Sequence, residues 1–249
     1  MQIQRLEGSG VQSANFWFGA FSPLPSPAGR ILRRLRQMSA AEFAQLISMS
    51  TFAPENAERF AAAIARFDAE NAQDPKSVVC DGAAQPHELV YSRWLTEWVL
   101  RLAPEASEPL RLAARCQHLR RWEIPRDSFP PTRAGYLKWR QTLKEFHADK
   151  AAEILQEVGY RDEVIGQVRA LNLKKNFPSD PESQILEDAL CLVFLERQFT
   201  DLAAKTTEEK IITALQKCWG KMTPAGHAAA LKLNYSEGEK RLLGLALGK

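Results

Sequence analysis

Apolar residues recur at every third and fourth position along most of the chain after Pro54, which is the spacing of one face of an α-helix. Phe60, Ala63, Ile64 and Phe67 form the first of these stripes. Further helices are predicted over about 87–102, 133–158, 164–171, 182–202, 208–219 and 224–233, and another is predicted to begin at Pro104. No segment alternates apolar and polar residues as a half-buried strand does. The pattern therefore predicts an all-α fold, a bundle of about eight helices.

Turn-forming residues separate the predicted helices. A loop over 74–86 contains Asp81 and Gly82, and three prolines between 125 and 131 break the chain before the long helix. Gly159 is placed to end that helix, because glycine adopts the left-handed conformation of a helix C-terminus without strain. Residues after 233 are expected to form a polar tail.

The first 52 residues differ in composition from the remainder of the chain. Residues 1–41 carry five arginines and a single glutamate, among glycine, serine and proline. We expect residues 1–52 to form a poorly structured basic extension and residues 53–249 to form one helical domain. An arginine-rich, acid-poor leader resembles an organelle transit peptide, and an upstream extension without a targeting role has the same composition. The predicted location is the cytoplasm, or an organelle if the leader is a transit peptide.

The overall composition is that of a soluble globular protein, with 45% hydrophobic and 25% charged residues. No apolar run approaches the ~20 residues that a transmembrane helix requires, so no membrane association is expected. Cys80, Cys116, Cys191 and Cys218 are scattered and include no CxxC pair. We expect reduced thiols, buried at Cys116 and Cys191, and neither disulfides nor zinc ligands.

Four polar residues lie within or beside the apolar stripes of four different predicted helices: His87, His118, His147 and Asp188. Imidazole and carboxylate are ligands that suit zinc, iron or manganese, and four such groups could converge on one ion. Taken singly, a histidine in such a place is more often a satisfied core residue than a ligand. Asp188 could likewise be neutralised by an arginine such as Arg115 or Arg121.

Residues 111–144 are strongly basic, with nine lysines and arginines against only Glu123 and Asp127. The planar guanidinium of arginine binds phosphate or carboxylate through two parallel hydrogen bonds, so the run favours an anionic ligand. Trp122, Tyr136 and Trp139 interleave with these cations and could stack on a nucleobase. A solvated charged surface with aromatic core residues beneath it would give the same pattern.

The order and surroundings of the polar residues resemble a known superfamily. His118 ends the small-residue segment LAARCQH, and Asp188 lies in LEDALCLVFLE. This arrangement is similar to the HD-domain superfamily of all-α metal-dependent phosphohydrolases. More closely, LAARCQHLRRWEIPR, GYLKWR and FHADKAAEIL, within a stretch from about Phe60 to Leu231, resemble an uncharacterised domain-of-unknown-function family, DUF4202, related to that superfamily.

The resemblance implies a role for each of the four residues. It assigns His87, His118 and Asp188 as ligands of a divalent metal (Mn, Fe or Zn) and His147 as a further ligand or proton carrier. Leu119 departs from the pattern, because the superfamily has an aspartate there.

Without that carboxylate, Glu187 or Glu123 would have to supply the missing oxygen ligand. The function implied is a metal-dependent phosphohydrolase, with Arg120 and Arg121 neutralising the phosphoryl oxygens of a small phosphorylated or nucleotide-like anion. The alternative is a non-catalytic helical module that binds an anionic ligand, or less favourably nucleic acid, through its basic cleft. The sequence does not fix an oligomeric state.

Overall fold

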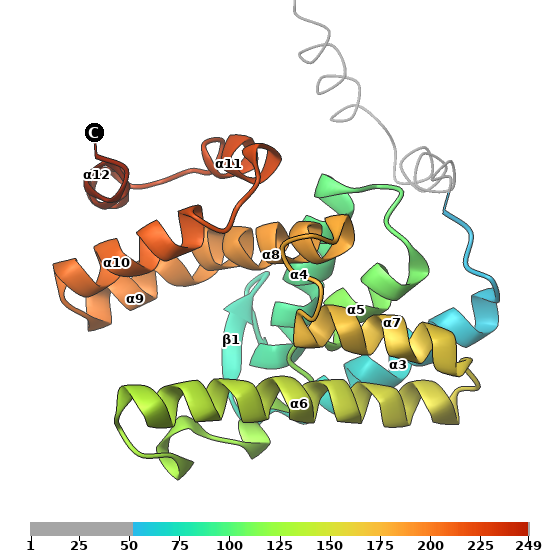
Figure 1. Cartoon of the computed structure of the whole chain (residues 1–249). Coiled ribbons are helices and arrows are strands. Elements are labelled where there is room, and N and C mark those ends of the chain that lie inside the picture. Colours follow the sequence, from blue (N-terminus) through green and yellow to red (C-terminus); the bar gives the residue numbers. More distant parts are fainter. Residues whose placement is uncertain (1–51, 249) are drawn as a thin grey trace, which may run out of the picture. The chain divides into compact units, whose positions relative to one another are not determined.

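Ten α-helices and one short hairpin make up residues 52–248, the part of the chain that the computed structural model describes (Figure 1). The all-α prediction is therefore confirmed. The chain divides into two units, residues 1–49 and 50–249, and the described residues belong to the second. The basic extension and its leader hypothesis lie outside the described residues.

The helices follow the predicted stripes closely. Their bounds are α3 (Ala57–Asn71), α4 (His87–Leu102), α5 (Glu108–Cys116), α6 (Arg133–Glu157), α7 (Asp162–Leu173), α8 (Pro181–Val193), α9 (Phe199–Lys205), α10 (Glu208–Trp219), α11 (Pro224–Ala230) and α12 (Glu237–Ala246). As predicted, Gly159 adopts a left-handed conformation just beyond the end of α6, with φ of 88°. Among the described cysteines, all four are free, and Cys116 and Cys191 are buried as expected.

The central helix is α5, which packs against α3, α4, α6, α7 and α8. Leu110, Leu112 and Cys116 have no exposed surface, and each buried leucine contributes about 1.5–3 kcal/mol to folding. Ser107 caps the helix by accepting a hydrogen bond from the Leu110 N–H at 3.2 Å. The helix therefore begins after Pro104, at Glu108, and not at the proline as predicted.

Other helices pack side by side. The long helix α6 runs beside α7, and α10 lies beside α9 and α12 (Figure 1). Between α8 and α9, residues Phe194–Gln198 form one turn of π-helix. The helix predicted over 182–202 is thus continuous in space but contains a widened turn, which changes the direction of the side chains that follow.

The sequence pattern did not predict a β-hairpin and one helix. The predicted loop over 74–86 contains the antiparallel strands β1 (Ser77–Cys80) and β2 (Ala83–Pro86), joined through Asp81 and Gly82 at φ of 52° and 79°. Four-residue strands with largely exposed side chains carry too little alternation to be recognised. The predicted polar tail contains α12, which begins with a capping box between Ser236 and Glu239.

Over the described part of the chain, none of the helices has both the length and the apolar composition needed to cross a membrane. This agrees with the absence of long apolar runs noted in the sequence.

Candidate functional site

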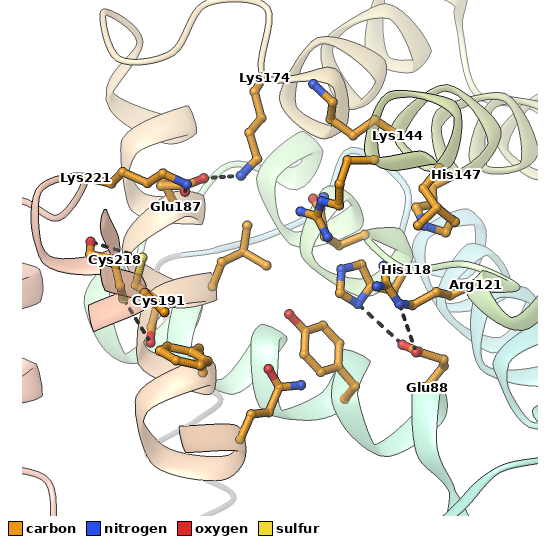
Figure 2. A pocket seen from close by; sticks show the side chains of 18 of the residues that line it. Glu88, His118, Arg121, Lys144, His147, Lys174, Glu187, Cys191, Cys218 and Lys221 are labelled. Atoms are coloured by element: carbon orange, nitrogen blue, oxygen red, sulfur yellow. Dashed lines mark hydrogen bonds and ion pairs between the residues drawn. The ribbon is translucent and has the colours of Figure 1, made fainter. Parts of the chain in front are cut away.

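A pocket of about 390 Å³ lies among α4, the turn after α5, α6, α8 and α10. Three of the four polar residues singled out from the sequence line it: His87, His118 and His147. Figure 2 shows His118 and Arg121 directed toward a carboxylate that the sequence interpretation had not included, that of Glu88.

Glu88 and His87 lie in the first turn of α4. Glu88 is on the buried face of that helix, three residues before the buried Tyr91 and seven before the buried Leu95. Its backbone N–H donates to the Asp74 carboxylate at 3.0 Å, which fixes the start of the helix. Glu88 Oε1 lies 3.4 Å from His87 Nδ1, and His87 is the more exposed of the pair.

His118 comes from the turn that follows α5, inside the bundle. The turn is held by Asn71 on α3, whose fully buried side chain accepts a hydrogen bond from the backbone N–H of Arg120 at 3.2 Å. Arg120 has φ of 52°, a left-handed conformation that reverses the chain at this point. The imidazole of His118 stacks on Tyr91 with ring centroids 4.3 Å apart, and its Nδ1 lies 3.4 Å from Glu88 Oε2.

His147 projects from the middle of α6 toward the same place. Its Nδ1 lies 2.7 Å from the carbonyl oxygen of Leu119, so Nδ1 carries the proton and donates to that oxygen. Nε2 is then an acceptor, and it is buried without a hydrogen-bond partner among the described residues. The rings of His118 and His147 are 5.8 Å apart.

Burial and charge set the protonation states of this cluster. Burial lowers the pKa of His118 to about 4 and that of His147 to about 3, so both are neutral at pH 7. Burial alone would raise the pKa of Glu88, but the adjacent imidazoles of His118 and His87 hold it well below its usual range. The carboxylate of Glu88 in turn raises the pKa of His87. The result is one carboxylate beside the neutral imidazole of His118.

The remaining wall of the pocket is basic. Six cationic side chains line it, against the two carboxylates of Glu88 and Glu187: Arg121, Arg140, Lys144, Lys174, Lys217 and Lys221. Within residues 52–248, neither Arg140 nor Lys144 has a carboxylate within ion-pair distance. Such an excess of positive charge attracts anions.

The structure does not bring Asp188 to the histidines. Asp188 accepts hydrogen bonds from the backbone N–H and the hydroxyl of Thr223, the residue that caps α11, and is not among the residues lining the pocket. The arginine suggested as its partner, Arg115, instead forms two hydrogen bonds of 2.6 Å with Asp68.

The two arginines assigned to phosphate have different surroundings. Arg121 lines the pocket, with Nε 3.8 Å from Glu88 Oε1. Arg120 is not a lining residue, because its guanidinium pairs with Glu70 at 3.3 Å and with Glu123. Glu123 is thereby occupied and is not available as the missing oxygen ligand.

The fold and pocket define a class of protein: an all-helical domain with a buried imidazole–carboxylate cluster in a basic cavity. Residues 61–243 match the family described as Domain of unknown function (DUF4202), and the chain belongs to that family. Searches of curated proteins and of solved structures each return no match.

Proposed function

We propose that this protein is a metal-dependent phosphohydrolase that acts on a small phosphorylated anion. The metal ligands are Asp74, His87 and Glu88, so that Asp74 and Glu88 take the places that the sequence resemblance gave to His118 and Asp188. The observation that carries the proposal is the grouping of these three side chains, in which Glu88 Oε1 lies 3.4 Å from His87 Nδ1.

The 3.4 Å separation between Glu88 Oε1 and His87 Nδ1 fits two ligands of a shared ion better than a hydrogen bond. Two ligand atoms that each lie about 2.0–2.1 Å from one tetrahedral ion are separated by about 3.3 Å, whereas hydrogen bonds between nitrogen and oxygen are usually about 2.7–3.2 Å long. Glu88 Oε2 is buried and accepts no hydrogen bond within residues 52–248. Asp74 adds a further carboxylate, since one ligand atom from each of Asp74, His87 and Glu88 lies within 4.8 Å of the others.

The chain's own residues perform the remaining tasks. A divalent ion at this position supplies Lewis-acid activation of water and of the phosphoryl group. Arg121, Arg140 and Lys144 bind the phosphoryl oxygens and oppose the charge that builds up on them. His147 presents Nε2 as a proton acceptor, and an anionic ligand beside it raises the pKa of this imidazole from its low resting value toward neutrality.

Elemental analysis tests the metal site directly. We expect the purified full-length protein to contain a divalent metal such as Mn, Fe or Zn, and His87→Ala and Glu88→Gln each to lose most of it. Glu123→Gln is the matched control, because Glu123 pairs with Arg120 outside the pocket. Circular dichroism establishes that each variant is folded.

Hydrolysis of p-nitrophenyl phosphate tests the reaction class. Added Mn²⁺, Fe²⁺ or Zn²⁺ should increase the rate for the wild type and for Glu123→Gln, but not for folded His87→Ala. Protein that contains no metal and shows no metal-stimulated phosphatase activity would contradict the proposal.

A second candidate function is metal-free binding of an anion. Two observations favour it. Leu119 stands where the HD dyad has a carboxylate, and the positive charge of Arg121, close to Glu88, disfavours binding of a metal ion there. In that case phosphate or nucleotides should raise the melting temperature in the presence of EDTA. A ligand at a hundred times its dissociation constant adds about 2.7 kcal/mol.

A further inference from the structure

A lysine pair lies on the wall of the pocket, away from the histidine cluster. Lys174 and Lys221 both contact the carboxylate of Glu187, Lys174 through Oε2 and Lys221 through Oε1 at 3.0 Å. The Glu187 side chain is only 4% exposed, whereas the side chains of Lys174 and Lys221 are 25% and 52% exposed. The glutamate is thus enclosed, and both ammonium groups remain accessible from the pocket.

One carboxylate cannot neutralise two ammonium groups, so Lys174, Lys221 and Glu187 together carry a net charge of +1. Lys217, one turn before Lys221 along the chain, lines the same pocket and has no ion-pair partner among the described residues. Hydrogen bonding to Glu187 fixes the direction of the two lysines before any ligand arrives. Fixed donors with excess positive charge form a preorganised site for an anion.

The backbone at Lys174 supports a role for its side chain. Lys174 ends α7 with φ of 56° and ψ of 39°, the left-handed conformation in which glycine is the usual residue. A lysine is less stable there than glycine, because the side chain disfavours positive φ. Helix termination alone does not require a lysine, while a pocket-lining ammonium does.

The histidine cluster and the lysine pair come from different elements. Glu88 and His118 belong to α4 and the turn after α5, whereas Lys174 and Lys221 follow α7 and α10. Figure 2 shows the two groups on separate sides of the pocket, with the cluster of Glu88 and His118 apart from Lys174, Glu187 and Lys221.

We propose that Lys174 and Lys221, held by Glu187, form a second anion subsite, and that the ligand of this pocket carries two separate anionic groups, of which one is a phosphate at the histidine cluster. The assignment rests on the proposed function in taking the pocket as the ligand site. It adds the substrate class, namely bisphosphates and related metabolites that carry two anionic groups on different carbons.

Calorimetric titration of the full-length protein with matched phosphates tests this subsite. The probes are fructose 6-phosphate with fructose 1,6-bisphosphate, and AMP with adenosine 3′,5′-bisphosphate. For at least one pair, the bisphosphate should bind roughly tenfold more tightly than its partner, the factor expected for one additional charge-assisted hydrogen bond. Ionic strength is kept constant, because screening alters such differences.

The double variant Lys174→Met, Lys221→Met should bring this affinity ratio close to one, because it weakens binding of the bisphosphate more than binding of the monophosphate. Lys175→Met is the control, since Lys175 is the exposed neighbour of Lys174 and does not line the pocket. A purely structural ion pair would change the melting temperature but not the ratio. The inference is wrong if no bisphosphate is preferred, or if the double variant keeps the preference.

The result is separable from the test of metal chemistry. Chromatography of the recovered ligand shows whether hydrolysis took place during the titration. A preference for the bisphosphate without bound metal or hydrolysis supports the subsite and contradicts the hydrolase proposal. Metal-stimulated hydrolysis without this preference supports the hydrolase proposal and contradicts the subsite.

Discussion

Glu88 is the residue on which the site depends, because one carboxylate lies within 4 Å of His87, His118 and Arg121. The protonation states of these side chains differ. Glu88 stays ionised, while burial keeps His118 neutral despite the carboxylate next to it. A small change in this cluster therefore changes the charge at the base of the pocket.

The neutral histidines predict how stability depends on pH in metal-free protein. His118 and His147 have folded-state pKa values of about 4 and about 3, below the unfolded value near 6.5, so the unfolded chain binds more protons as the pH falls below 6.5. Each buried imidazole should reduce the free energy of unfolding by up to about 1.4 kcal/mol per pH unit between pH 6.5 and 4. Urea denaturation with EDTA at pH 7.5, 6.5 and 5.5 measures this loss.

Two histidine variants separate the contributions. His147→Gln should lose less stability on acidification than the wild type. His87→Gln should lose more, because the pKa of His87 is raised and its contribution to stability is present below pH 6.5 and disappears as the pH rises. Equal pH dependence in the two variants would show that these protonation states are wrong.

Helix phase explains which acidic residue of α8 enters the pocket. Asp188 shares the stripe of Leu192, Leu195 and Phe199, and all three apolar side chains are buried in the core. Glu187 instead shares its face with Cys191 and Phe194, which line the pocket. The sequence stripe thus already placed Asp188 on the core side, but the resemblance to the HD pattern favoured it as a ligand.

Asp188→Ala should separate a capping role from a metal-binding role. Loss of the hydrogen bonds to Thr223 should lower the free energy of unfolding by about 1–3 kcal/mol, in the range of lost helix caps and of hydrogen bonds to charged groups. Metal content should not change. Asp201→Ala on the exposed face of α9 is the control and should alter neither quantity. Loss of metal from a folded Asp188→Ala would return Asp188 to the ligand set.

The individual helices were easier to predict from the sequence than the way in which they pack together at the site. The bounds of α4 and α10 follow from apolar stripes and turn residues, because these signals are local. The partners of Glu88 come from residues 87, 118 and 121, and their approach depends on the packing of α5 inside the bundle. Glu88 itself could have been found from its place one turn before Tyr91 on the buried face of its helix.

The second unit of the chain is expected to fold without the first. Its apolar core draws on α3 through α12, so a variant lacking residues 1–50 should keep the helical content and the melting temperature of the full chain within about 2 °C, a change of less than 1 kcal/mol. Differential scanning calorimetry of both proteins measures this. A markedly lower melting temperature would show that residues 1–50 contribute to the stability of the helical unit.

The π-helical turn at Phe194–Gln198 has a consequence for how this sequence can vary. The turn accommodates one residue more than an α-helical turn would, so it sets the rotational position of α9 relative to α8. Substitutions within it leave this rotation intact, whereas deletion of a single residue would turn α9 by about 100° about the helix axis. Gene variants of this family should therefore tolerate exchange of amino acids in this turn far better than a change in its length.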